Sequence, residues 1–314
     1  MRTLNNSGII QNVLELKEHQ AKLEDKIVVR PAKPSDREQV FKFCEQTWEW
    51  GDYIPQVWER WLKQPNGKLF VAVINKTPVG IGYVAITKPG EAWLEGARTN
   101  PAHRRRGVAT AIANASLQFA LQRGAKTARL VTEFDNAAAK TVLKKLGFQP
   151  VSEFVETTCE KMDDEKSGKS RSAKKKDEEN LWRFLQTSEC FKKSAGLFTK
   201  LFTWFSLGEP ELKSFLKERK AVIYEENSVI SGLMLIDDKV SEVWKENSVQ
   251  TCYVDGNRKA VVDMIRFLKQ HCRKSKIAKI YGFACNHKPV TSALLQMGFE
   301  PHGSSKIIYE KTLK

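Results

Sequence analysis

A short basic turn with a single glycine constrains the fold of this chain more than any other feature. Residues 103–110, His-Arg-Arg-Arg-Gly-Val-Ala-Thr, follow a predicted strand at 92–99 and lead directly into a helix with periodic apolar residues. The first backbone N–H groups of a helix have no partner within it, and the helix dipole favours a negative charge beside them. Gly107 and Ala109 leave room for a phosphate, and the arginines supply charged donors. The turn is therefore predicted to bind a pyrophosphate, with a solvated surface turn as the alternative.

The spacing Arg104-x-x-Gly107-x-Ala109 resembles the pyrophosphate loop of the GNAT superfamily of N-acetyltransferases, which binds acetyl-CoA. The predicted elements around the turn also occur in the order found in that superfamily. They are a strand at 27–32 followed by a helix N-cap at Ser35 and Asp36, a hairpin with strands at 70–74 and 79–87, a strand at 128–132, and a helix at 136–146 that ends at Gly147-Phe148. The resemblance covers residues 27–160, and it implies an α/β (α+β) fold with a mixed, mostly antiparallel sheet flanked by helices.

The resemblance further implies which residues would hold acetyl-CoA. In the superfamily, the backbone of the fourth strand binds pantetheine and the thioester much as an added strand would. The start of the next helix binds the pyrophosphate, and an asparagine follows the fifth strand. The acetyl-CoA contacts expected here are Ala97, Arg98, Thr99, Arg104, Arg105, Arg106, Gly107, Val108, Ala109, Thr110 and Asn136.

Acetyl transfer to an amine needs a group that removes a proton from the amine. Strand alternation places Glu95 and Ala97 on one face, so Glu95 is expected beside the thioester as the general base, directly or through water. A structural carboxylate paired with Arg98 or another base is the alternative. Many GNAT enzymes protonate the leaving thiolate with a tyrosine seven residues after the helix asparagine. Leu143 occupies that position and cannot donate a proton, so water, Tyr53 or another donor would have to replace it.

An aromatic, acidic segment at 48–61 is expected to border the acceptor pocket, because GNAT folds usually place it there. Trp48, Asp52 and Tyr53 suit a cationic amine, although packing against the sheet explains such residues equally well. The sequences Asp-Tyr-Ile-Pro at 52–55 and Glu-Gly-x-Arg-x-x-Pro at 95–101 are similar to the histidine N-acetyltransferase-like branch. An amino acid or another small amine is thus the favoured acceptor, with a protein N-terminus or lysine as the rival.

The C-terminal part repeats the order of elements in a degenerate form. A hairpin at 220–236, a strand at 249–254, a helix at 259–272, a strand at 278–284 and a helix that ends at Gly298-Phe299 are predicted. Asp255 stands where the first copy has arginines, and it would repel a pyrophosphate. The expected organisation is a helical arm at 1–26, an acetyl-CoA-binding GNAT domain at 27–160, a charged linker at 161–179, and a degenerate GNAT-like domain at 180–314. A convergent α/β domain is the alternative for the last part.

Charge and composition exclude several classes. The net charge of +15 is spread as +7 over residues 1–162, zero over 163–179 and +8 over 180–314, so no dedicated nucleic-acid site is expected. No stretch approaches the roughly 18 apolar residues of a membrane span. Six scattered cysteines favour a reducing, cytoplasmic compartment, and the absence of paired Cys or His spacing argues against a metal. Phe191, Phe198, Leu201, Phe202 and Phe205 are predicted as an apolar helix face in a core or interface, with membrane binding as the alternative.

These features predict an N-acetyltransferase that moves an acetyl group from acetyl-CoA to a primary amine by direct attack on the thioester. The alternative is a non-catalytic acyl-CoA-binding or interaction module, which Leu143 favours and Glu95 disfavours. One active site per chain is expected, in a monomer or a homodimer.

Overall fold

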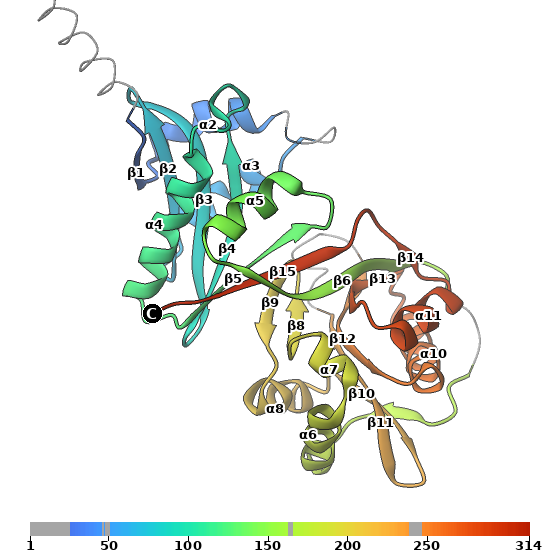
Figure 1. Cartoon of the computed structure of the whole chain (residues 1–314). Coiled ribbons are helices and arrows are strands. Elements are labelled where there is room, and N and C mark those ends of the chain that lie inside the picture. Colours follow the sequence, from blue (N-terminus) through green and yellow to red (C-terminus); the bar gives the residue numbers. More distant parts are fainter. Residues whose placement is uncertain (1–25, 46, 48–50, 163–165, 239–246) are drawn as a thin grey trace, which may run out of the picture. The chain divides into compact units, whose positions relative to one another are not determined.

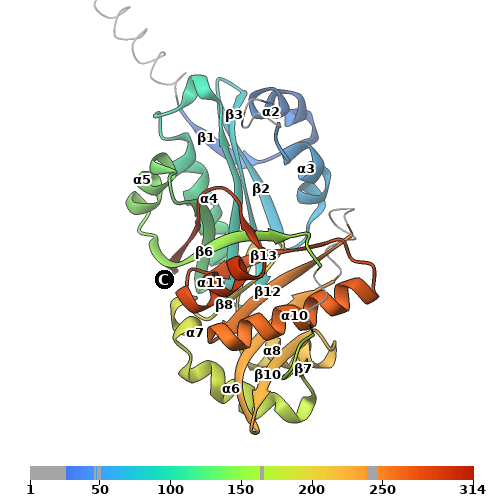
Figure 2. The same cartoon turned by 90° about the vertical axis from the view of Figure 1, so that its right-hand side faces the viewer.

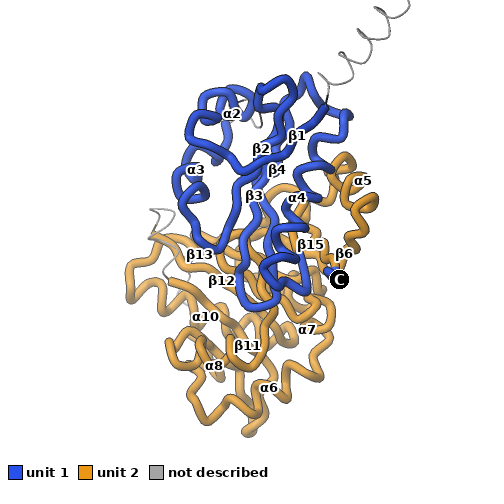
Figure 3. Tube along the Cα trace, turned by 90° about the vertical axis from the view of Figure 1, so that its left-hand side faces the viewer, with its two compact units in different colours: residues 1–128, 312–314 blue, residues 129–311 orange. Residues whose placement is uncertain are grey.

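A computed structural model describes residues 26–314, apart from 46, 48–50, 163–165 and 239–246 (Figure 1). The helical arm predicted at 1–26 therefore lies outside the described residues except for Lys26. The chain divides into two compact units, which are residues 1–128 with 312–314 (unit 1) and residues 129–311 (unit 2) (Figure 3). Both units combine mostly antiparallel strands with helices, which confirms the predicted α/β class.

Unit 1 is a sheet with helices on both faces (Figure 2). Its strands are β1 (Val28–Pro31), β2 (Gly67–Ile74), β3 (Thr77–Lys88) and β4 (Glu91–Thr99), each antiparallel to the next. Residues of α2 (Arg37–Cys44) and α3 (Ile54–Lys63) share one core cluster with Val71 and Ile81. Residues of α4 (Val108–Gln122) share a separate cluster with Ala72 and Val79. The sheet therefore separates two apolar cores, and β4 leads into the start of α4.

Two glycines of β3 bring α4 close to the sheet. A Cβ on Gly80 would lie 2.5 Å from Cγ1 of Val108, and one on Gly82 would lie 2.6 Å from Cγ2 of Ile112. Larger residues at either position would push the helix away. The sequence thus fixes the N-terminal turn of α4 against the strand that pairs with β4.

Unit 2 contains a longer sheet with the strand order β5-β15-β6-β13-β12-β11-β10-β7. The strands are β5 (Thr127–Glu133, which begins in unit 1), β6 (Gln149–Cys159), β7 (Ser170–Ser172), β10 (Ala221–Glu226), β11 (Val229–Asp237), β12 (Ser248–Gly256), β13 (Lys279–Cys285) and β15 (Lys306–Thr312), with β14 (Glu300–Pro301) beside β6. The helices are α5 (Ala137–Lys145), α6 (Glu178–Thr187), α7 (Glu189–Lys193), α8 (Glu209–Lys217), α10 (Arg258–Lys274) and α11 (Lys288–Gln296). β12 and β13 are parallel, whereas β6 is antiparallel to both β13 and β15.

The border of the compact units therefore differs from the border predicted at residue 160. β5, α5 and β6 fall in unit 2, because β15 from the C-terminal end of the chain lies between β5 and β6. β6 in turn pairs with β13 along six residues, from Phe154 opposite Cys285 to Cys159 opposite Ile280. Pairing between strands far apart in the sequence leaves no local signal, so composition could not locate this border.

The same short sequence occurs at β1 and again at β7. Arg-x-Ala-Lys-x-x-Asp occurs at 30–36 and again at 171–177. Arg30 forms two hydrogen bonds of 2.7 and 2.6 Å with Asp36, and Arg171 forms two of 2.7 and 2.9 Å with Asp177. β1 pairs with β2 and β7 pairs with β10, so each tie lies at the beginning of the same antiparallel strand order. The second copy of the order begins at β7, inside the segment predicted as a linker.

Asp263 of α10 also fixes the end of the charged segment predicted at 161–179. Its carboxylate accepts hydrogen bonds from the backbone N–H groups of Gly168, Lys169 and Ser170, at 2.6 to 3.0 Å, and from the Ser170 hydroxyl at 2.7 Å. Residues 168–172 are therefore ordered rather than a plain exposed loop. Composition could not predict this strand, because a solvated linker and a strand held in place by a single carboxylate can contain the same charged residues.

The predicted hairpins are confirmed, and one predicted helix is wrong. Asn75 and Lys76 join β2 to β3 with φ angles of 50° and 67°, and Asn227 and Ser228 join β10 to β11 in the same conformation. The phenylalanine-rich stretch at 197–206 is not a helix face but a hairpin of β8 (Leu197–Lys200) and β9 (Thr203–Ser206). The rings of Phe198 and Phe205 still pack in a core as predicted, with their centroids 5.5 Å apart, whereas Phe202 is exposed.

Candidate active site

The N-terminus of α4 carries no internal cap. Gly107 occupies the N-cap position with φ +88°, it has no side chain to accept from the helix N–H groups, and the first turn contains no acidic residue. A Cβ on Gly107 would meet no atom within 4 Å. These properties leave the first N–H groups and the positive end of the helix dipole open to an external anion.

The three arginines before this helix are exposed. Among the residues that the structure describes, Arg104 and Arg105 have no ion-pair partner, and Arg105 adopts a left-handed φ of 61°. The preceding turn η2 (Pro101–His103) is held by Asn100, whose side chain accepts from the N–H of Ala102 at 3.0 Å. The predicted loop is therefore an ordered turn in which the charges of Arg104 and Arg105 are not paired with another described residue.

A β-bulge interrupts β4 where the thioester is expected. Tyr83 pairs with Glu95 and Ile81 pairs with Arg98, so Gly96 and Ala97 together face Gly82 alone. Gly96 has φ +68°, and a Cβ there would lie 2.5 Å from Cη2 of Trp61 in α3. Only glycine fits both the conformation and the contact. The bulge turns the backbone of exposed Ala97 out of the regular ladder.

Glu95 lies directly opposite Tyr83 on the face of the sheet that α3 covers. Burial raises the pKa of the Glu95 carboxyl to about 7, and the positive charge of Arg60 together with a hydrogen bond involving Trp93 opposes this rise. The carboxyl group consequently changes charge near neutral pH, which suits a group that accepts and returns a proton.

Two phenols share the surroundings of Glu95. Burial and the nearby Glu95 charge raise the pKa of Tyr83 to about 12, and burial followed by the same charge raises the pKa of Tyr53 to about 12. The Trp61 ring stacks on Tyr83 with centroids 4.4 Å apart, and Tyr53 meets Trp61 edge to face at 6.1 Å. The carboxyl group of Glu95 therefore lies near two protonated phenols and an indole ring.

Arg98 pairs with Asp52 rather than with Glu95. Its Nε lies 2.7 Å from Oδ2 of Asp52 and its Nη2 lies 3.3 Å from Oδ1. Only 1% of the Asp52 side chain is exposed, and Oδ1 also accepts from the N–H of Ile54 at 3.1 Å. The structure thus places Asp52 and Tyr53 near Glu95 and Arg98, but the carboxylate of Asp52 already has partners within the protein. Trp48 lies outside the described residues.

Asn136 and Leu143 belong to unit 2, whereas the other described candidates belong to unit 1. The Asn136 side chain accepts from the N–H of Ala139 at 3.0 Å and so caps α5. Leu143 is 6% exposed in the same helix. The predicted Gly-Phe corner is present, because Gly147 has φ +77° and the N–H of Phe148 donates to Leu143 at 3.0 Å.

The corresponding helix start in unit 2 is closed. Asn257 caps α10 by accepting from the N–H of Ala260 at 2.9 Å, so a side chain occupies the place that Gly107 leaves open. Asp255 is buried and accepts from the Tyr253 hydroxyl at 2.7 Å. The thiol of Cys190 in α7 donates to the Val254 carbonyl at 3.6 Å. Internal groups thus satisfy the end of β12 and the beginning of α10.

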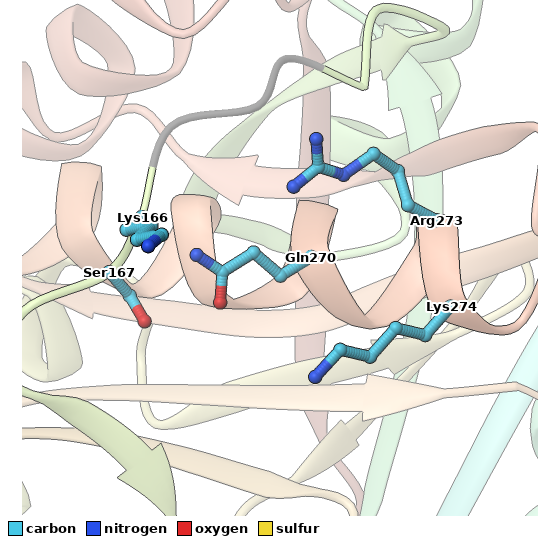
Figure 4. Close-up of a pocket in the computed structure, with 5 residues that line it drawn as sticks. All are labelled: Lys166, Ser167, Gln270, Arg273 and Lys274. Carbon is cyan, nitrogen blue, oxygen red and sulfur yellow. The ribbon is translucent and has the colours of Figure 1, made fainter.

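A basic hollow of about 520 Å³ lies elsewhere in unit 2, at the C-terminal end of α10 (Figure 4). Lys166, Ser167, Gln270, Arg273 and Lys274 line it. Cations near a helix C-terminus stabilise the dipole, which accounts for their position without a ligand.

Sequence reasoning missed Arg60, Tyr83 and the bulge. The Pro-Gly turn at 89–90 between β3 and β4 was a signal for the register that places Tyr83 opposite Glu95, and the glycine after Glu95 was a signal for the bulge. Nothing local indicates that Arg60 of α3 influences a carboxylate on β4. Within the described ranges no group of three or more His, Cys, Asp or Glu residues could hold a metal ion, and no helix there is long and apolar enough to span a membrane.

Part of the sequence matches a known protein family. Residues 37–148 match the acetyltransferase (GNAT) family. A stretch of 110 residues is 30% identical to an uncharacterized N-acetyltransferase of Methanocaldococcus jannaschii, and it covers 31% of this chain and 48% of that protein. The match therefore spans about half the length of this relative.

Solved structures extend the similarity of fold to nearly the whole chain. A GCN5-related N-acetyltransferase from Sphaerobacter thermophilus has a TM-score of 0.59 at 11% identity, over 92% of this chain and 96% of that chain. An acetyltransferase from Thermoplasma acidophilum, described as putative, has a TM-score of 0.54 at 16% identity, over 91% and 99%. A fungal glucosamine N-acetyltransferase region of a multi-domain enzyme has a TM-score of 0.59 at 12% identity, over 91% and 38%. The chain thus has the fold of the GCN5-related N-acetyltransferases, and its residues 37–148 match the GNAT family model.

Proposed function

We propose that this chain is an N-acetyltransferase that uses acetyl-CoA, with its active site in residues 27–160. The open N-terminus of α4 supports this proposal most strongly. It combines a glycine N-cap, exposed arginines and a first turn without acidic residues, all within the segment that matches the GNAT family. Pyrophosphate contacts are assigned to the loop and first turn at 104–110, and Asn136 is kept as a further contact.

The backbone of β4 and the Glu95 carboxylate are proposed to perform different parts of the acetyl transfer. The backbone at Ala97, Arg98 and Thr99 holds the pantetheine arm and donates to the thioester oxygen as negative charge develops there. The Glu95 carboxylate accepts a proton from the acceptor ammonium, so that the neutral amine forms a C–N bond with the acetyl carbon while the C–S bond breaks. The attacking nitrogen then loses its second proton, and the leaving thiolate gains a proton from water or from Tyr53 to give the free thiol. Acetyl-CoA supplies the activated acetyl group.

The acceptor proposed is a primary amine, with an amino acid or another small amine favoured over a protein N-terminus or lysine. Tyr53 supplies aromatic surface near Glu95, which suits an amine that carries an apolar or cationic portion. Trp48 is retained as a further candidate. The proposal includes a cytoplasmic location and a monomer or homodimer.

One site per chain is proposed. In the second copy of the strand order, Asn257 caps the helix start and Asp255 lies beside it, so neither an open helix terminus nor an arginine cluster is present there. The second copy is proposed to be a GNAT-like domain without a pyrophosphate loop, and the repeated Arg-x-Ala-Lys-x-x-Asp tie supports this tandem arrangement.

A non-catalytic acyl-CoA-binding module is the second candidate, and buried Leu143 favours it. A leucine at this position cannot protonate a leaving thiolate. The two candidates differ in whether the acetyl group leaves acetyl-CoA.

The deciding experiment incubates the full chain with acetyl-CoA and a panel of amino acids, small amines and peptides, and measures free thiol. The proposal predicts thiol release well above the rate of hydrolysis with at least one amine. Tight acetyl-CoA binding without amine-dependent thiol release would instead establish the module.

A further inference from the structure

The guanidinium of Arg98 joins two parts of unit 1 that carry different proposed tasks. It forms the two hydrogen bonds to Asp52 described above, and its Nη1 donates to the Ala97 carbonyl at 3.0 Å. The exposed fractions of the two side chains are 14% for Arg98 and 1% for Asp52. The pair is therefore shielded from water, and its hydrogen bonds are charge-assisted and directional.

Asp52 connects this pair to the start of α3. Its Oδ1 accepts from the N–H of Ile54, the first residue of the helix, while the Arg98 guanidinium lies 5.3 Å from the ring centre of Tyr53. Trp61 of the same helix touches the bulge at Gly96. The N-terminal turn of α3 and the bulge of β4 are thus held together at one point by Asp52 and Arg98.

We propose that Asp52 and Arg98 are positioning residues that orient the bulge at Ala97 for the thioester, and that neither side chain contacts the acceptor amine. This inference rests on the proposed acetyl transfer. The Ala97 carbonyl accepts from the Arg98 guanidinium, which the buried Asp52 carboxylate holds in place, so the carbonyl has little freedom to move. A misplacement of about 1 Å at a reacting centre can lower the rate about 100-fold.

The chain offers a matched control for this pair. Arg30 and Asp36 also form a two-bond ion pair in unit 1, through Nη1 and Nη2, and Arg30 donates to the carbonyl of the next residue, Pro31, at 3.1 Å. The Arg30 pair lies on β1 and η1 (Pro34–Asp36), and β2 and β3 separate β1 from β4 in the sheet. Its removal should affect stability without affecting the thioester.

The test compares Arg98→Gln, Asp52→Asn, their double variant and Arg30→Gln in the full chain. For Arg98→Gln and Asp52→Asn we expect kcat per folded molecule to fall about tenfold or more, with KM for acetyl-CoA changed by less than about threefold. The double variant should lose no more than the worse single variant, because both changes break one unit. Arg98→Lys should have a kcat as low as that of Arg98→Gln, since an ammonium cannot form the two parallel hydrogen bonds that a guanidinium forms with a carboxylate.

A kcat per folded molecule that stays at the wild-type value in Arg98→Gln would overturn the inference, and so would an equal fall in Arg30→Gln. If the wild type acetylates no amine, the proposed function fails and the positioning role is judged by hydrogen exchange. Acetyl-CoA must then slow exchange at residues 95–99 in the wild type and in Arg30→Gln but not in Arg98→Gln. Any other exchange pattern overturns the inference as well.

Discussion

At the scale of single residues, Glu95 shows how a fold brings the pKa of a carboxyl group close to neutral pH. Burial beside aromatic rings disfavours the charged form, while Arg60 partly restores it, and the resulting pKa is about 7. An ordinary exposed glutamate would be fully ionised at neutral pH and would be a weaker base. The environment rather than the residue type therefore makes Glu95 the best candidate base.

The rate should follow the ionisation of Glu95. As pH rises through about 7 the carboxyl loses its proton, so kcat/KM should increase with pH and level off above that value. Glu95→Gln should lower kcat at least about 100-fold and remove this dependence. Glu91→Gln, on the same strand, serves as the control and should keep the wild-type profile. A pH profile unchanged in Glu95→Gln would remove Glu95 from the mechanism.

Arg60 gives a second check on the same carboxyl. Its positive charge lowers the pKa of Glu95, so Arg60→Gln should move the midpoint of the pH profile upward. The measurement is kcat/KM between about pH 5 and 9. A midpoint that moves downward would contradict the electrostatic account of this site.

Residue-level roles could be predicted from the sequence only in part. The face on which Glu95 lies follows from strand alternation with Trp93, but the alternation predicted to continue to Ala97 was wrong, because the bulge at Gly96 and Ala97 breaks the period of two. The burial of Asp52 against Arg98 depends on the approach of α3 to β4, and no pattern within either segment encodes that approach. For this reason a carboxylate expected at the acceptor proved to be engaged inside the protein.

At the scale of elements, the turns and helix ends that depend on neighbouring residues were predicted correctly from the sequence. Asn-Lys and Asn-Ser turns gave both hairpins, and Gly147 and Gly298 ended their helices with left-handed φ angles. The β8–β9 hairpin was missed, because rings three or four residues apart fit a helix face as well as a hairpin with alternating sides. β7 was missed because its stability comes from Asp263, about ninety residues away.

Asp263 should stabilise unit 2 in a pH-dependent way. Burial raises the pKa of its carboxyl, but the hydrogen bonds from Gly168, Ser170 and Lys169 outweigh burial and hold the pKa below its usual value. The stabilisation is therefore full above the ordinary aspartate pKa and is lost as pH falls through the lower folded value.

Asp263→Ala should reduce the free energy of unfolding by about 1–3 kcal/mol at pH 7, because three backbone N–H groups lose a charged acceptor. The difference from the wild type should shrink below about pH 4. Urea unfolding at both pH values measures it, with exposed Glu300→Ala as the control. An equal difference at pH 7 and at low pH would contradict the account.

At the scale of the whole molecule, the described part of the chain contains the same strand order twice, and of the two helices that follow these copies only α4 begins without a side-chain cap. β1-β2-β3-β4 and β7-β10-β11-β12 each begin with an Arg–Asp tie and each lead into a helix, α4 or α10. Gly107 leaves the first helix uncapped, whereas Asn257 caps the second. The central claim is that acetyl-CoA binds only at the first.

A calorimetric titration of the full chain with acetyl-CoA tests this claim most directly. The account predicts one molecule bound per chain and a Kd that rises about tenfold or more in Arg104→Gln, since a charge-assisted hydrogen bond to pyrophosphate is lost. Arg258→Gln, at the start of α10, should leave the Kd unchanged. Two bound molecules per chain, or a Kd sensitive to Arg258 and insensitive to Arg104, would contradict it.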